Sequence, residues 1–146
     1  MAAAEHTKEM SFGYWCARIG QAFRARLEMR TRQMGLSGMQ AIVLSILEGL
    51  GSSTLVELAR MVEHAHPSVL RHLDSLEQEG FVERTPHPRD RRVKVIRLTE
   101  KGRAAVPPVR AAMFEVQEQA AEGLDDAEVE HLLAGFKKIA MNLGCC

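Results

Sequence analysis

The hydrophobic pattern begins with a helix near the N-terminal end of the chain. Five apolar positions recur at steps of three and four residues, which places them on one helix face: Phe12, Trp15, Cys16, Ile19 and Phe23. The spacing predicts a helix over about 11–33 that ends near Gly35. Most of its arginines lie away from the apolar face.

Three further helices are predicted between residues 37 and 80. Ser37 with Gln40, and Thr54 with Glu57, form capping-box patterns that open the first two. The first of the three is almost entirely apolar and is expected to be buried on several sides. After a break at 63–65, Pro67 occupies the first turn of the third helix, whose apolar face is Val69, Leu73 and Leu76. Two short helices joined by a tight turn are typical of a helix-turn-helix.

Alternating residues then predict two strands, over 81–84 and 93–98, joined by a turn rich in proline and arginine. Thr99 is expected to cap the next helix, which Pro107 and Pro108 should bend or delay. Asp125 with Glu128, spaced as in a capping box, opens a final helix with an apolar face of Val129, Leu132, Leu133, Phe136, Ile139, Ala140 and Leu143. The predicted fold is mainly α with a small β-hairpin wing: a winged helix-turn-helix core flanked by N- and C-terminal helices.

Composition and charge fit one soluble globular unit that faces a polyanion. The 146 residues are 46% hydrophobic and 26% charged, with a net charge of zero. Residues 84–103 hold eight basic side chains against two acids, whereas 115–130 hold seven acids and no Lys or Arg. Because the sequence lacks a signal-like start and a membrane-length apolar run, a cytoplasmic protein without membrane contact is expected.

The sequence resembles the MarR (multiple antibiotic resistance regulator) family of transcription regulators. The resemblance is carried by LDSLEQEGFVER at 73–84, PRDRR at 88–92 and LTEKG at 98–102. It implies a non-enzymatic, cofactor-free regulator that binds double-stranded DNA as a homodimer. Within the single unit 1–146, it implies a DNA-binding lobe over 36–102 and dimerisation regions over 11–35 and 103–146.

The expected DNA contacts lie on the wing and on the recognition helix. DNA carries one charge per about 1.7 Å of its axis, so arginines at a protruding turn gain by releasing counterions. The wing residues are Arg89, Asp90, Arg91 and Arg92. By resemblance, Arg92 enters the minor groove, and Asp90 holds its guanidinium. The recognition-helix residues are His66, Ser68, Leu70, Arg71, His72 and Ser75, with Arg71 expected at a guanine edge and His66 near a phosphate.

The resemblance also implies a dimer interface and a ligand pocket. The predicted interface residues are Phe12, Phe23, Leu132, Leu133, Phe136, Ile139 and Leu143. A twofold axis would place two recognition helices on half-sites about 10–10.5 base pairs apart. A pocket for a small aromatic carboxylate is expected at Trp15, Arg18, Ile19, Val43, Met113 and Phe114, although the same residues also suit a core or interface.

The sequence favours a DNA-binding regulator over three other kinds of function: redox sensing, metal binding or catalysis, and protein interaction without DNA. Cys16 suggests a redox-responsive regulator of the same fold, but a buried, inert thiol is expected there. No metal site is expected, because the helices after the wing, from residue 99 onward, hold only His131. No catalytic motif appears. A winged-helix protein-interaction module that does not bind DNA would be expected to carry a neutral or acidic wing rather than this basic one.

Overall fold

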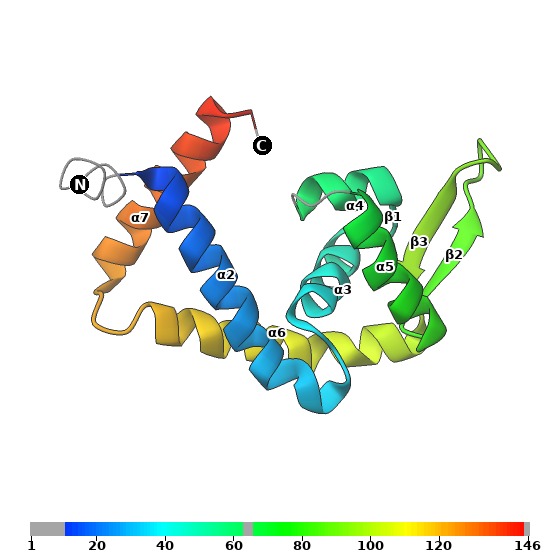
Figure 1. Ribbon diagram of the computed structural model, residues 1–146, viewed down its shortest axis with the longest axis horizontal. Coiled ribbons are helices and arrows are strands. Elements are labelled where there is room, and N and C mark those ends of the chain that lie inside the picture. Colours follow the sequence, from blue (N-terminus) through cyan, green and yellow to red (C-terminus); the bar gives the residue numbers. More distant parts are fainter. Residues whose placement is uncertain (1–10, 63–65, 145–146) are drawn as a thin grey trace, which may run out of the picture. The chain divides into compact units, whose positions relative to one another are not determined.

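The computed structural model describes residues 11–62 and 66–144 (Figure 1). Its contacts group the chain into two compact units, 1–113 and 114–146. The elements, in order, are α2 (Phe12–Thr31), the 3-10 helix η1 (Arg32–Met34), α3 (Gly38–Leu50), β1 (Ser53–Thr54), α4 (Leu55–Met61), α5 (His66–Gln78), β2 (Val82–Pro86), β3 (Lys94–Leu98), α6 (Glu100–Ala120) and α7 (Asp126–Asn142). The mainly α fold with a small β wing is therefore confirmed.

Local capping determines where the helices begin. The boxes that open α3, α4 and α7 are all formed, with the side chain and the backbone bonding in both directions. Each such cap contributes about 1 kcal/mol by satisfying N–H groups that the helix itself leaves unpaired. Gly80 follows α5 with a φ of 78°, a left-handed conformation that suits glycine.

The wing is part of a three-stranded antiparallel sheet rather than a hairpin alone. Strands β2 and β3 pair from Val82 opposite Leu98 to Pro86 opposite Lys94. The two-residue strand β1 adds to the other edge of β3, with Ser53 opposite Ile96. A two-residue strand has no alternation to detect, so the sequence pattern did not predict it.

The core of the first unit lies between α3, α5 and the sheet. The predicted apolar face of α5 is confirmed, since Val69, Leu73 and Leu76 are buried. Helix α3 is buried along most of its length, but Leu50 at its end is 47% exposed, so the expected burial is wrong there. In α2, only Leu27 and Thr31 are buried.

Helix α6 runs unbroken from Glu100 through both of its prolines. The backbone N–H of Gly102 donates to Thr99 Oγ1 at 3.1 Å, which confirms the predicted cap. The expected delay of the helix is wrong, because α6 begins at this cap, well before Pro107.

Among the described residues, no helix combines the length and the apolarity that a membrane span requires.

Candidate DNA-binding surface

The wing tip is organised around the carboxylate of Asp90. One of its oxygens accepts the backbone N–H of Arg92 at 3.0 Å and the Arg92 Nε–H at 3.2 Å. The second oxygen accepts Arg92 Nη2 at 3.4 Å. The Arg92 side chain, and then the Arg92 backbone N–H, hold the pKa of Asp90 below its usual range. One acid therefore closes the turn and orients the guanidinium, as the sequence suggested.

The orientation of Arg92 leaves its charge available to a ligand. Its side chain is 91% exposed, and Arg89 and Arg91 beside it are also exposed. A protruding turn with three accessible guanidinium groups suits a polyanion, since each group can displace a condensed counterion.

The recognition helix α5 presents a mixed outer surface. Arg71 and Leu70 are exposed, and Ser68 and His72 are half-buried. His66 begins the helix, but its side chain lies outside the described residues, as do residues 63–65, where the sequence predicts a break. Arg71 is thus accessible on the surface of α5, and the DNA contacts predicted for Arg71 and His66 stay predictions.

The hydroxyl of Ser75, a predicted DNA contact, is already engaged by other side chains of the fold. Ser75 is half-buried, and its hydroxyl accepts Gln40 Nε2–H at 3.0 Å and donates to Glu79 Oε1 at 2.9 Å. The pairing spans 35 positions of the sequence, so helical periodicity could not have predicted it.

An ion-pair cluster joins the recognition helix to the wing. Arg84, on β2, donates to Asp74 Oδ1 at 2.7 Å and to Glu77 Oε2 at 2.9 Å on α5. We call these three residues the Arg84 clamp. In the sequence, Arg84 stands out only as one of several basic residues, although two acids one turn apart on the preceding helix, Asp74 and Glu77, were a usable signal for its partners.

The LTEKG segment fastens the base of the wing. Thr99 Oγ1 lies 2.6 Å from the carbonyl oxygen of Gly80, to which it donates. Lys101 Nζ donates to the Glu79 carbonyl at 2.6 Å and lies 4.2 Å from the centre of the Phe81 ring. Gly102 approaches the Phe81 backbone so closely that a Cβ there would lie 2.0 Å from its carbonyl oxygen. The motif is therefore a joint between the end of α5 and the start of α6.

The residues expected in a dimer interface lie at the surface of the single chain. Phe12, Leu132, Leu133, Phe136 and Leu143 are exposed. Phe23 and Ile139 are half-buried. Each terminal helix thus carries an apolar stripe that the described residues do not cover completely.

The residues expected to line a ligand pocket are placed in different environments. Trp15, Ile19 and Phe114 are exposed and Met113 is half-buried, but Val43 has no exposed surface and belongs to the core. Val43 thus has no surface open to a ligand in the single chain, and its predicted place in a pocket stays a prediction. The guanidinium of exposed Arg18 donates to the Tyr14 hydroxyl at 3.2 Å.

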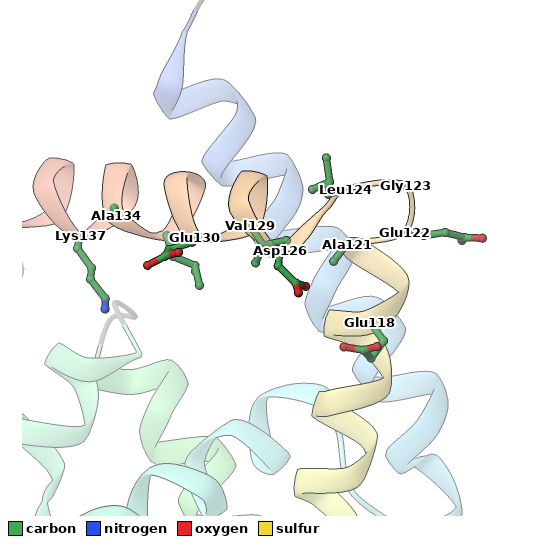
Figure 2. A pocket seen from close by; sticks show the side chains of 11 residues that line it. Glu118, Ala121, Glu122, Gly123, Leu124, Asp126, Val129, Glu130, Ala134 and Lys137 are labelled. Atoms are coloured by element: carbon green, nitrogen blue, oxygen red, sulfur yellow. The ribbon is translucent and has the colours of Figure 1, made fainter.

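A pocket in the second unit has the wrong charge for a carboxylate. It lies between the end of α6 and α7, where Glu130 and Lys137 project from the same side of α7 (Figure 2). Four acids and one lysine line it: Glu118, Glu122, Asp126, Glu130 and Lys137. An anionic ligand would be repelled there.

Cys16 differs from its expected state. The thiol is exposed in the single chain rather than buried. It lies beside Trp15 on α2, a helix of which only Leu27 and Thr31 are buried. Within residues 11–62 and 66–144, no group of three potential metal ligands gathers.

Comparisons with known proteins agree with this architecture. The sequence model of the MarR family matches residues 34–93. The transcriptional regulator PA3341 is 33% identical over 92% of this chain and 98% of its own, with a TM-score of 0.81. A MarR-family regulator from Silicibacter pomeroyi is 25% identical over 95% of this chain and 94% of its own (TM-score 0.80). A mutant MarR from E. coli, solved in complex with operator DNA, is 24% identical over 89% and 94% of the two chains (TM-score 0.79). The chain belongs to the MarR family of winged-helix transcription regulators.

Proposed function

We propose that the protein is a transcriptional repressor that binds an inverted-repeat DNA operator as a homodimer. The observation that carries this proposal is the wing tip, where Asp90 orients an Arg92 side chain that is 91% exposed. A guanidinium held at a protruding turn matches the negative potential of a narrow minor groove. The similar E. coli regulator solved with operator DNA supports the same use of the fold.

The wing and helix α5 contribute differently to DNA recognition. The wing arginines supply affinity through phosphates and the minor groove, and Arg71 on α5 supplies sequence preference in the major groove. The Arg84 clamp ties α5 to β2, so both contacts are presented as one rigid surface.

Salt dependence of duplex binding tests this function. A regulator making about 6–10 phosphate contacts loses about 10³–10⁵ in affinity between 50 and 200 mM salt. We expect Arg89→Ala to lower the slope of log K against log salt by about one per protomer, and Arg26→Ala, an exposed arginine on α2, to leave it unchanged. A winged-helix module that binds only proteins would show no salt-dependent duplex binding.

A second copy of the chain is the proposed cover for the apolar stripes on α2 and α7. Phe12 is 71% exposed and Leu133 54%, and large side chains in such stripes mark interaction surfaces. We expect Phe136→Glu to produce a monomer by sedimentation, whereas Lys138→Glu on the same helix remains dimeric. A wild-type protein that sediments as a monomer at micromolar concentration contradicts the dimer.

We also propose that a small aromatic carboxylate binds the exposed residues Trp15, Arg18 and Ile19 and that its binding releases the DNA. An arginine beside aromatic and aliphatic side chains suits a carboxylate on a ring. Benzoate and hydroxybenzoates should raise the melting temperature and weaken duplex binding, and Arg18→Gln should abolish both effects. If these ligands change neither the melting temperature nor the duplex binding of the wild type, the pocket is excluded.

An alternative signal is oxidation of Cys16. It predicts that peroxide releases DNA from the wild type and not from Cys16→Ser.

A further inference from the structure

Gln40 is a buried amide that links two distant helices. The buried polar side chains among the described residues are Thr31, Gln40 and Ser53. Those of Thr31 and Ser53 bond within five residues of the sequence, whereas Gln40 on α3 bonds to Ser75 on the recognition helix. A buried amide is costly unless both of its ends are paired, and here both are.

The two ends of the amide hold different parts of the fold. Gln40 Oε1 accepts the backbone N–H of Ser37 at 2.8 Å, and Nε2 donates to Ser75 Oγ at 3.0 Å. The Ser75 hydroxyl in turn donates a hydrogen bond to Glu79 Oε1, one turn further along the chain. The start of α3 and the recognition helix are therefore joined by one side chain.

The start of α3 is itself fixed against α2. A Cβ on Gly38 would lie 2.4 Å from the Arg24 carbonyl oxygen, so the two helices touch backbone to backbone. The Thr31 hydroxyl bonds to the carbonyl oxygens of Leu27 and Leu36 and secures the connecting segment. Gln40 thus extends from a rigid support.

On these grounds, which rest on the proposed function, we propose that Gln40 is a positioning residue for DNA recognition, acting through Ser75 to set the rotation of α5 about its axis. Apolar contacts at Val69, Leu73 and Leu76 are not directional and permit small rotations, whereas a hydrogen bond restricts them. Arg71 lies one turn before Ser75 on the same side of α5, so it turns with Ser75.

Small rotations are sufficient to matter at a base edge. An atom about 6 Å from a helix axis moves about 1 Å when the helix turns by about 10°. That displacement takes a hydrogen bond of about 2.9 Å beyond the range in which it forms. Loss of the Gln40–Ser75 bond should therefore weaken sequence readout while leaving phosphate contacts in place.

The test compares specific with non-specific binding. The probes are the duplex that wild type enriches most from random sequence and a scrambled duplex of the same composition. We expect Gln40→Leu and Ser75→Ala each to lower the affinity ratio of the two duplexes about tenfold, with unchanged binding to the scrambled duplex. Ser75→Thr, which keeps the hydroxyl, and Ser53→Ala, which removes a buried hydroxyl that bonds only locally, should retain the wild-type ratio.

A double-mutant cycle identifies the route of the effect. If Gln40 acts through Ser75, the double variant loses about tenfold, no more than either single variant. A loss near a hundredfold would mean independent roles, such as a direct contact of Ser75 with DNA, and would overturn the proposal. A folded Ser75→Ala variant with a wild-type ratio would also overturn it.

Hydrogen exchange in the free protein keeps the inference separate from DNA binding. We expect faster amide exchange along α5 in Ser75→Ala than in wild type, and no change in Ser53→Ala. If wild type enriches no duplex, the proposed function fails, and α5 exchange alone then decides whether Gln40 positions the helix. Unchanged exchange along α5 refutes that positioning.

Discussion

Gly102→Ala tests whether the joint at the base of the wing depends on backbone contact. The new methyl group would lie 2.0 Å from the carbonyl oxygen of Phe81 and 3.1 Å from its carbonyl carbon. Both are backbone atoms, so no side-chain rotation relieves the overlap. The start of α6 must move away from Phe81, the residue that precedes β2.

The size of the effect follows from opposing contributions. Alanine in a helix is favoured over glycine by about 1 kcal/mol. Overpacking costs about 1–3 kcal/mol, and movement of α6 also strains two of the bonds that Thr99 makes, to Gly80 and from Gly102, worth about 1 kcal/mol each. The expected net destabilisation is about 2–4 kcal/mol, which corresponds to a fall in melting temperature of about 5–15 °C for a chain of this size.

Gly49→Ala is the matched control for this prediction. Gly49 also lies in a helix, and a Cβ there would meet no atom within 4 Å. The same substitution should therefore stabilise by about 0.5–1 kcal/mol, opposite in sign. Thermal and urea unfolding measure both variants. A Gly102→Ala protein as stable as wild type would refute the close approach of α6 to β2.

Three further outcomes are expected. Arg84→Met, which removes the Arg84 clamp, should lower stability by about 1 kcal/mol in dilute buffer, and the loss should shrink in 1 M salt; a salt-independent loss would indicate packing instead. The backbone N–H and then the hydroxyl of Thr54 bond to Glu57 and hold its pKa below the ordinary 4.5. This stabilisation is complete above about pH 4.5 and is lost as the pH falls through the lowered pKa. The melting temperatures of wild type and Glu57→Gln should therefore converge as the pH is lowered. Melting temperatures that diverge instead would contradict this role of Glu57. Arg92→Ala should weaken operator binding without changing the melting curve, and Asp90→Ala should weaken it less and keep the same sequence preference; wild-type affinity in Arg92→Ala would exclude its role.

The helix boundaries and the wing could be read from the sequence because their causes are local. A capping box involves residues three apart, and all three boxes formed as predicted. The bond from Asp90 to Arg92 spans two residues, so its position within the charged turn was sufficient to predict it. The apolar face of α5 followed from helical spacing.

Tertiary structure decided the features that join distant segments. Ser75 has the spacing of an outward-facing residue, but a glutamine 35 positions away takes up its hydroxyl. Strand β1 pairs with the free edge of β3, and Val43 has no exposed surface in the folded chain. Cys16 is exposed because the apolar stripe of α2 is not covered within the single chain. Sequence patterns record which side of a helix is apolar, whereas partners, burial and close approach depend on which elements meet in space.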